Sequence, residues 1–480
     1  MNGANRKSAG TAVFSALLAV LVFCGCSSSI SKLDTLDDYT ATFVPESRVS
    51  LRGKKYLTLS EARETALANN PTLRAALSSI RSAKYSYYRA LSAWSPEITA
   101  SWETRHTDSR GYDLREPPAG IFPEERRLSN AGSLRATWLL FNGFERELNI
   151  LSSRAEYEYN ISAADDVKRL LLRAVMYAWC DILLASEEIK IFRADRSFQD
   201  AALRQAEQQF KSGHISYATV LNFKIRSSKA QSRVTLAEYE RQTALDALAA
   251  LLGYSINDFP RDIKLQTMPP QRMELYHELA FYLEQAVLNR PDLKAEKAEY
   301  ERCYRRRQAA YSAFLPEIYL FADMSFDSAS AKYGDYKVKS SYYNHPSLSF
   351  GVTGKWNIFR GFDSWNELRR RKALEQTALW GLNRKFLDVT TEVRDALEHC
   401  RNSCIQIGIF REMAEWVTEQ RDLIYSEYIN GRETIARVNQ AQSELVEAQS
   451  SLALWHVRSH KAFAQLNAAL GKDAIPPPEL

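Results

Sequence analysis

The sequence predicts a mainly α-helical protein with a small membrane β part, built from a unit of helix, strand, strand, long helix and helix that occurs twice. Three observations lead to this fold class. The 480-residue chain has only 18 Gly and 15 Pro, so long uninterrupted elements are expected. The two halves share landmarks at a nearly fixed offset. Four short stretches between the predicted helices alternate apolar and polar residues, as strands do.

The predicted helices are unusually long. From Gly143 to Phe210 the sequence has no Pro and no further Gly, which predicts a helix of roughly 67 residues, about 100 Å long at 1.5 Å per residue. Residues 59–93 are predicted to form one helix, because the ring of Pro96 prevents its continuation. The helices 59–93 and 217–252 together match the long helix in length, so we expect them to stack end to end beside it.

Apolar residues in the last helix of each half are spaced alternately by four and three positions. This spacing runs from Ala230 to Leu251 in the first half and from Ala448 to Ala469 in the second. It is typical of coiled coils, in which one stripe of each helix packs against a neighbour. Each half is therefore predicted to form a plank two helices wide.

Five landmarks recur in the same order, either 220 or 218 residues later. The pairs are Pro71 and Pro291, Pro96-Glu97-Ile98 and Pro316-Glu317-Ile318, Phe141-Asn142-Gly143-Phe144 and Phe359-Arg360-Gly361-Phe362, Gly213 and Gly431, and Leu252-Gly253 and Leu470-Gly471. Five coincidences in one order indicate a duplicated unit.

The alternating stretches predict strands with one apolar and one polar face. Ile98, Trp138, Leu320 and Trp356 belong to the apolar set and are expected to face lipid. Such strands, about ten residues long, are typical of outer-membrane barrels. On strand pattern alone, an ordinary half-buried sheet is at least as good an interpretation. The duplication, and a lipid anchor that the amino terminus predicts, favour the barrel. Four strands cannot close a barrel, so other copies of the chain are expected to complete it.

The amino terminus has the pattern of a lipoprotein signal peptide. Arg6 and Lys7 precede an uncharged run from Thr11 to Cys24, which Gly25 and Cys26 follow. Gly25-Cys26 resembles the bacterial lipobox, which implies that Cys26 is lipidated and becomes the first mature residue. Ordinary cleavage near Gly25, with an incidental cysteine, is the alternative.

Composition argues against nucleic-acid binding and against a disulfide framework. Without residues 1–25 the chain has 61 basic and 58 acidic residues, a net charge of +3. Besides Cys26, that part of the chain contains Cys180, Cys303, Cys400 and Cys404, which are expected to be mostly buried thiols, although pairing among Cys180, Cys400 and Cys404 stays open.

The sequence contains no pattern that points to an enzyme, a metal or a cofactor. His456 and His460 lie one helical turn apart, but a solvated helix face is favoured over a metal site. Cys400 and Cys404 are a weak match to a zinc site. Nucleophile elbows, P-loops and dinucleotide fingerprints are absent from the sequence.

The duplicated plan, its Asn-Pro phrase, Phe-Asn-Gly-Phe before the long helix and the closing Leu-Gly resemble the TolC-type bacterial outer-membrane efflux proteins, the outer membrane factor family, in its lipoprotein subgroup. The resemblance implies a homotrimer with a twelve-stranded barrel in the cell outer membrane and a helical tunnel through the periplasm. It also implies docking to a periplasmic adaptor, the membrane fusion protein, of an inner-membrane pump.

The predicted organisation has five parts. They are a lipoprotein signal peptide (1–25), an extended linker (26–58), a first repeat (59–272, with strands at about 97–105 and 132–141), a second repeat (273–471, with strands at about 317–326 and 347–359) and a tail (472–480).

We expect the chain to be a passive duct for efflux of small molecules, and we leave two alternatives open. One is a duct for type I protein secretion, which this sequence does not distinguish from drug efflux. The other is a structural coiled-coil lipoprotein without a channel, which leaves the four strands unexplained. The transported substrate and the class of pump do not follow from the sequence.

The periplasmic aperture is expected where the long helices turn back, at Gly213 and Gly431, because glycine adopts a left-handed turn readily. The resemblance implies acidic residues six positions after each glycine and nine after the second. Thr219, Arg437 and Gln440 occupy these positions here. Arg437 is expected either to line the aperture or to pair on the outer helix surface, with Glu433 as a candidate partner.

Overall fold

The computed structural model describes residues 51, 54–109, 125–255, 258–269, 278–333 and 341–472. All of them belong to one compact unit that begins at Leu51. Cys26, the predicted signal peptide, most of the predicted linker and nearly all of the predicted tail lie outside the described residues. Among the described helices, none combines the length and the apolar character that a membrane crossing requires.

The first repeat has the predicted order of elements. Its helices and strands are α3 (Leu59–Asn69), α4 (Pro71–Leu91), the 3₁₀ helix η2 (Ser92–Trp94), β2 (Glu97–Ser109), β3 (Glu125–Phe141), α5 (Glu145–Lys211) and α6 (Tyr217–Leu251).

The second repeat has the same order. It consists of α7 (Leu279–Asn289), α8 (Pro291–Ala309), the 3₁₀ helix η3 (Ala310–Phe314), β5 (Glu317–Tyr333), β6 (Ser341–Lys355), α9 (Asp363–Ile429) and α10 (Ile435–Ala469). Both long helices, α5 and α9, contain 67 residues. The predicted fold class, a duplicated and mainly helical unit with four strands, is confirmed.

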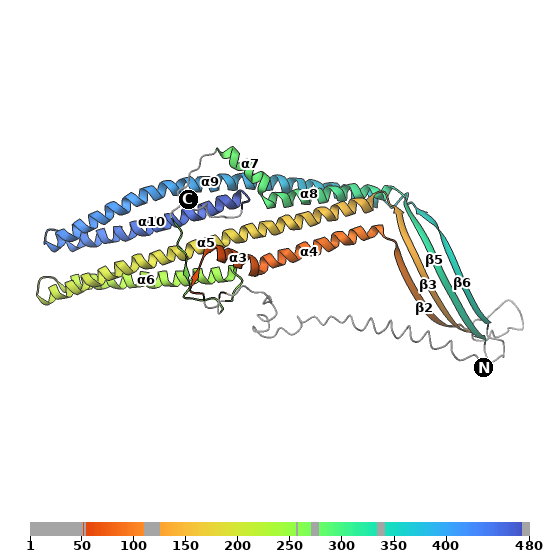
Figure 1. Ribbon diagram of the computed structural model, residues 1–480, viewed down its shortest axis with the longest axis horizontal. Helices are drawn as coiled ribbons and strands as arrows, with labels where there is room; N and C mark the ends of the chain where they lie inside the picture. Colours follow the sequence, from red (N-terminus) through yellow and green to blue (C-terminus); the bar gives the residue numbers. More distant parts are fainter. Residues whose placement is uncertain are drawn as a thin grey trace. The chain divides into compact units, whose positions relative to one another are not determined.

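Within the unit the strands extend from one end of the helices, and both helical hairpins turn at the opposite end (Figure 1). Near the strands the helices lie in the order α4, α5, α8 and α9, because α5 contacts α4 and α8 while α8 also contacts α9. Nearer the hairpin turns, α6, α5, α10 and α9 are neighbours in that order. The shorter helices therefore stack end to end beside each long helix, as expected.

Residues 59–93 do not form the single helix that was predicted. The helix breaks at Asn70, whose backbone is extended, and α4 begins at Pro71. The Asn70 side chain accepts hydrogen bonds from the backbone N–H groups of Thr72 and Leu73, so it caps the new helix. A proline at the first helical position needs no N–H partner, which explains why the break falls here.

Part of the predicted linker is built into the unit. The short strand β1 (Tyr56–Leu57) pairs in parallel with β4 (Lys264–Leu265). Leu51 and Leu57 are fully buried in the core of the first repeat. An extended segment with two buried leucines is a structural part of the repeat.

The four long strands form one antiparallel sheet in the order β2-β3-β5-β6. The two hairpins have equivalent registers, because Glu97 faces Thr137 and Glu317 faces Lys355. All four strands extend further than predicted into polar sequence on the side away from the helices, since ladder hydrogen bonds do not require apolar side chains. At its other end β6 is shorter than predicted, because it stops at Lys355 instead of continuing to Phe359.

The core of each repeat lies about midway along its long helix. In the first repeat Val175, Trp179 and Ile182 of α5 pack with side chains from α3 and α6. Val393 and Leu397 occupy the corresponding places in α9 of the second repeat. The coiled-coil stripes of α6 and α10 face these clusters, and burial of their apolar side chains stabilises the planks.

Candidate functional site

One face of the sheet is apolar across all four strands. The register aligns side chains in rows, each with one residue per strand. Three rows are Ile98, Ala136, Ala322 and Phe350; Ala100, Leu134, Met324 and Leu348; and Trp102, Gly132, Phe326 and Pro346. The next row outward is polar and contains Thr104, Asn130 and Ser328. On β3 the apolar band runs from Gly132 to Leu140, and nine strand residues are about enough to cross a membrane's hydrocarbon core when tilted.

The opposite face is polar and internally hydrogen-bonded. Arg135 donates to Asp323 at 2.9 Å across β3 and β5. The hydroxyls of Ser325 and Ser347 are 2.7 Å apart. The sequence did not reveal these partners, because strand register decides which polar residues meet. A water-filled interior would suit this face, as it does the lumen of a membrane barrel.

Tryptophans mark the edge of the apolar band nearest the helices. The Nε1 group of Trp138 donates to the carbonyl of Trp94 at 2.9 Å, and that of Trp356 donates to the carbonyl of Phe314 at 3.2 Å. These contacts are equivalent in the two repeats. The indole rings stay exposed while their polar atoms are satisfied, an arrangement common at membrane surfaces.

The turn from strand to long helix contains two consecutive left-handed residues in each repeat. Gly143 and Phe144 have φ angles of 65° and 64°, and Gly361 and Phe362 have φ angles of 59° and 66°. For phenylalanine this conformation is unfavourable by about 1 to 2 kcal/mol. The ring of Phe144 packs edge to face on Phe141, with ring centroids 5.5 Å apart. The repeated Phe-x-Gly-Phe phrase thus holds a sharp turn between the apolar face of the sheet and the long helix in each repeat.

The Leu-Gly landmarks pack against the Asn-Pro landmarks. Gly253 has a left-handed backbone, and a Cβ atom at this position would lie 2.7 Å from the carbonyl oxygen of Asn69. A Cβ on Gly471 would lie 2.8 Å from the backbone nitrogen of Arg290. Only glycine allows so close an approach. Landmarks about 180 residues apart in sequence therefore meet in each repeat.

A buried ionic network joins the two repeats at this level. Arg290 donates to both carboxylate oxygens of Asp292, at 2.9 and 2.7 Å, and lies 2.7 Å from Glu392 on α9. Burial alone would raise the pKa of Asp292, but the bonds from Arg290 and the nearby charges of Arg169 and Lys385 hold that pKa below its usual value. Arg169 on α5 also donates to the carbonyl of Ala468. The network anchors α5 to the end of α10.

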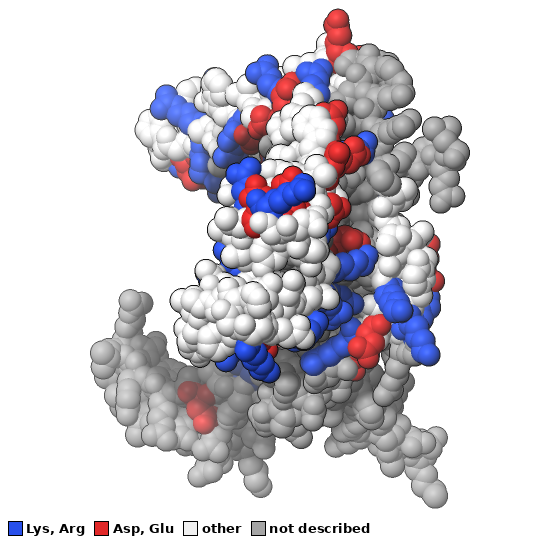
Figure 2. All heavy atoms as spheres, turned by 90° about the vertical axis from the view of Figure 1, so that its left-hand side faces the viewer, with Lys and Arg blue, Asp and Glu red and all other residues white. Residues whose placement is uncertain are grey.

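The hairpin turns lie at the end of the unit that Figure 2 faces, and charged side chains of both signs are visible in that view. Gly213 and Gly431 have φ angles of 78° and 73°. Each ends its helix in a Schellman turn, since the next residue, His214 or Arg432, donates to a carbonyl five residues back.

Thr219, Arg437 and Gln440 lie in the first turns after these glycines. Thr219 donates its backbone N–H to the Ser216 hydroxyl, which caps α6. Gln440 donates to Glu444 at 2.9 Å. Arg437 is exposed, and within the described part of the chain its side chain has no ion pair. Its candidate partner Glu433 instead accepts a hydrogen bond from the backbone N–H of Thr434, so the expected pairing is not formed.

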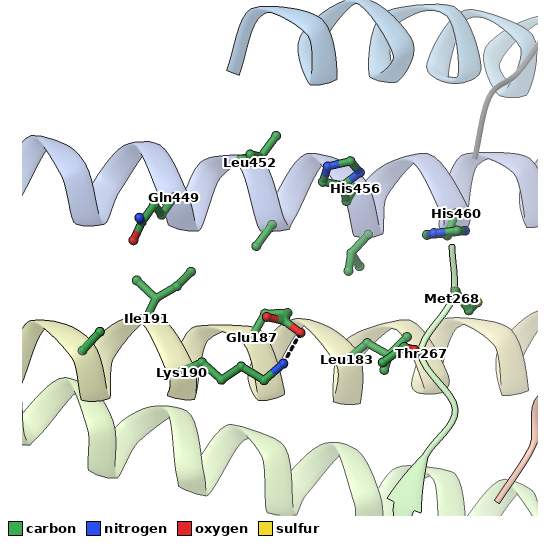
Figure 3. A pocket seen from close by; sticks show the side chains of 13 residues that line it. Leu183, Glu187, Lys190, Ile191, Thr267, Met268, Gln449, Leu452, His456 and His460 are labelled. Atoms are coloured by element: carbon green, nitrogen blue, oxygen red, sulfur yellow. Dashed lines mark hydrogen bonds and ion pairs between the residues drawn. The ribbon is translucent and has the colours of Figure 1, made fainter. Parts of the chain in front are cut away.

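The prediction of a solvated face for the histidine pair is wrong for His460. His456 and His460 line a cavity of about 560 Å³ between α5 and α10, opposite the ion pair of Glu187 and Lys190 (Figure 3). Burial and the neighbouring His456 lower the pKa of His460 to about 4. Since α10 packs on both α9 and α5, it has a second buried face that a single apolar stripe does not predict.

The cysteines of the described unit are all free thiols. Burial raises the pKa of Cys180 and that of Cys400 to about 12, so both stay protonated. Within the described ranges, His, Cys, Asp and Glu side chains form no group of three that would hold a metal ion. The two-faced sheet, the sharp turns and the hairpin tips are built in the same way in both repeats.

A family model supports this view. The model described as outer membrane efflux protein matches residues 62–254 and again residues 282–472, so each repeat matches once. The chain belongs to the outer membrane efflux protein family. Its members are outer-membrane channel proteins, and the described sheet and planks supply both parts of such a channel subunit.

Relatives and solved structures agree with the family. Nodulation protein T of Rhizobium leguminosarum bv. trifolii is 20% identical over 349 residues, covering 72% of this chain and 73% of the relative. The pyoverdine export outer membrane protein OpmQ of Pseudomonas aeruginosa is 22% identical over 305 residues, covering 64% and 62%.

The CmeC outer membrane channel of Campylobacter jejuni has the same fold, with a TM-score of 0.75 at 14% identity over 87% of each chain. The outer membrane protein VceC of Vibrio cholerae has a TM-score of 0.71 at 16% identity, over 86% of this chain and 96% of its own.

Proposed function

We propose that three copies of this chain form a passive duct across the outer membrane and periplasm, and that the duct exports small molecules. The carrying observation is the sheet, which has one apolar face, one polar face and two unpaired edges, β2 and β6. Unpaired edges in hydrocarbon would leave backbone groups without partners at several kcal/mol each. If β6 of each copy pairs with β2 of the next around a closed ring, no edge is left unpaired, and three copies give twelve strands.

The two repeats support this assembly, because equivalent residues differ in exposure. Trp138 is 41% exposed whereas Trp356 is 61% exposed, and Leu140 is 42% exposed whereas Ile358 is 84% exposed. The first-repeat residues have the second repeat as a neighbour, while the second-repeat residues have none. A neighbouring copy could pack on β6 and α9 in the way that the second repeat packs on β3 and α5. It would then cover the additional exposed surface of the second-repeat residues.

The same comparison gives the register between copies. Thr137 faces Phe321 in the β3–β5 pair. The residue equivalent to Thr137 in the second repeat is Lys355, and the residue equivalent to Phe321 in the first repeat is Ser101. Lys355 of one copy is therefore expected to face Ser101 of the next. Copies that carry both Lys355→Cys and Ser101→Cys should form disulfide-linked oligomers. A matched control with Lys355→Cys and Thr107→Cys should not, because six residues along a strand separate the thiols by about 20 Å.

Single-channel recording in a planar bilayer tests the duct itself. The purified oligomer should produce stable conductance steps. A folded oligomer that does not conduct would contradict the proposal and favour a structural lipoprotein. The relative named for pyoverdine export supports a small molecule, rather than a protein, as the exported substrate. We further propose a periplasmic adaptor and an inner-membrane pump as partners, because the chain itself holds no energy-coupling motif.

We propose that Cys26 is the first mature residue and carries lipid, which anchors the amino terminus in the outer membrane. The apolar run before Gly25-Cys26 supports this assignment. Several acyl chains anchor a protein firmly, whereas one binds only marginally. Cys26→Ala should abolish labelling by a fatty-acid probe, and persistent labelling would refute the assignment.

We also propose that Arg437 lines the periplasmic aperture, with Thr219 and Gln440 nearby. Its exposure and its lack of an ion pair among the described residues support this position. Three arginines around one axis would create a positive potential that disfavours cations. Arg437→Asp should shift the reversal potential in a salt gradient toward cation selectivity. Gln440→Asp offers a matched comparison three residues away. An unchanged reversal potential in Arg437→Asp would place Arg437 outside the aperture.

A further inference from the structure

An apolar pocket lies at the junction between sheet and helices in the second repeat. This junction pocket has a volume of about 320 Å³, and its lining includes Phe314, Trp356, Ile358, Phe362, Trp365 and Arg360. Five of these six side chains are apolar or aromatic, and all five are at least 40% exposed. A group of exposed apolar side chains of this kind marks a binding surface.

The junction pocket is continuous with the apolar face of the sheet. Trp356 and Ile358 follow directly after β6 and continue the outward alternation of Phe350 and Val352. The opposite side of the same junction is charged, and Glu317 and Lys355 of the polar sheet face lie there. The pocket therefore lies on the side expected to face lipid, at the edge of the apolar band, where headgroups would be found.

Two arginines stand beside this pocket. Arg360 lines it and also lines the charged pocket on the other side of the junction, and the Arg360 side chain forms no ion pair with any described residue. The guanidinium of Arg369 lies over the ring of Trp365, 5.5 Å from the ring centroid, and Arg369 is exposed one helical turn below it. Positive charge next to exposed aromatic side chains at the edge of a membrane band is complementary to an anionic headgroup.

The first repeat has the same junction without these charges. The residues equivalent to Arg360 and Arg369 are Asn142 and Leu151, and an acidic residue, Glu147, replaces Trp365. The general architecture of the turn thus requires neither arginine. The difference confines any recognition of an anion to the second repeat.

A neighbouring copy would not fill the junction pocket. The first-repeat junction already has its neighbour, because a Cβ on Gly143 would meet Ser312 and Leu315 of the second repeat. Even so, Trp138 and Leu140 keep about two fifths of their surface, and Phe144 is 60% exposed. The equivalent surface in the second repeat would remain open after the next copy has docked.

We propose that the junction pocket of the second repeat binds an anionic phospholipid from the leaflet nearer the helices. The acyl chains would lie on Trp356 and Ile358, and the phosphate would contact Arg360 and Arg369. This inference rests on the proposed insertion of the sheet into a membrane. One lipid for each copy would follow, and the bound lipid would fix the height of the duct in the bilayer.

Native mass spectrometry of the purified full-length oligomer tests the proposal, with dioleoyl phosphatidylglycerol and dioleoyl phosphatidylcholine as probes. The wild type should bind the anionic lipid more tightly than the zwitterionic one. Arg360→Gln combined with Arg369→Gln should weaken binding of the anionic lipid on the order of 30-fold, since each arginine near a membrane surface contributes several-fold. Binding of phosphatidylcholine should change little. Lys211→Gln combined with Arg432→Gln, the matched control, removes equal charge at the hairpin tips and should leave the binding of phosphatidylglycerol unchanged.

Three results would overturn the proposal. Equal binding of phosphatidylglycerol by wild type and by the junction variant is the first. Complete competition by millimolar glycerol phosphate would assign the arginines to a free phosphate ligand instead. A loss of oligomer with unchanged lipid binding per oligomer would assign the pocket to the neighbouring copy.

Lysine at both positions should retain most binding, which separates charge from a role of the arginines in folding. Conductance of the same samples keeps the two proposals apart. Normal channels with unaltered lipid binding would refute only the lipid site, and absent channels would refute the duct.

Discussion

Replacing Met324 by arginine tests the assignment of the apolar face to lipid. Met324 lies on the central strand β5, is 59% exposed, and shares a row with Ala100, Leu134 and Leu348. An arginine at the bilayer midplane of a barrel costs about 2 to 4 kcal/mol. The row lies one step from the middle of the band, so about 2 kcal/mol per copy is expected. Three copies would lose about 6 kcal/mol, comparable with the total stability of many domains.

The adjacent residue offers the control. Ser325 points to the polar face, where its hydroxyl contacts that of Ser347 at 2.7 Å. Ser325→Arg removes this hydrogen bond, a loss of about 1 kcal/mol, and places its charge in water. The assay is the fraction of oligomer that survives in unheated gel samples, together with its thermal midpoint. Met324→Arg should lower both strongly and Ser325→Arg only slightly. Equal losses at the two positions would refute the assigned faces.

Three further changes test the packing of the helices. Gly471→Ala should lower the free energy of unfolding by roughly 2 to 3 kcal/mol, because the new Cβ would meet the Arg290 backbone. Gly213→Ala, where a Cβ has open space, should cost about 1 kcal/mol. Denaturant unfolding measures both, and equal values would contradict the close approach at Gly471. Because of His460, the free energy of unfolding should fall by up to about 3 kcal/mol as the pH drops from about 6.5 to about 4, since only the unfolded state takes up the proton in this range. His460→Gln should flatten the pH dependence of the unfolding midpoint. An unchanged slope would show that His460 is solvated. Arg290→Leu should cost about 3 kcal/mol because it removes the closest ionic partner of the buried Asp292 and of the partly buried Glu392. A loss below about 1 kcal/mol on thermal unfolding would mean that water or the remaining cations satisfy both carboxylates.

The fold class could be predicted because hydrophobic periodicity and repeated landmarks can be read directly from the sequence. The absence of glycine and proline from residues 144–210 favours a continuous helix, and α5 is found there. Its partner α9 is less obvious, since Gly381 and Gly408 lie within it. Tertiary packing overrides the roughly 1 kcal/mol that each glycine costs in a helix. The repeat offset, rather than propensity, therefore predicts the second long helix.

The contacts that join the two repeats could not be predicted from the sequence. Arg290 and Glu392 meet because α7, α8 and α9 converge at one level, and no periodicity relates their positions. The break at Asn70 had a signal, the Asn-Pro phrase, which was treated as a landmark rather than as a helix cap. His460 was misjudged because a heptad stripe reveals one partner helix, whereas α10 has two.

The pairing of β3 with β5 determines when the membrane surface can form. Arg135 and Asp323 are in contact although 188 residues separate them. The helical hairpins need only the closure of short turns at Gly213 and Gly431, and such local contacts form fastest. A lone β2–β3 hairpin is marginal in water, so the sheet gains its support only when the second repeat has been made. The helical hairpins α5–α6 and α9–α10 are therefore expected to form before the apolar face of the sheet, which delays exposure of that face to water until the second repeat has been made.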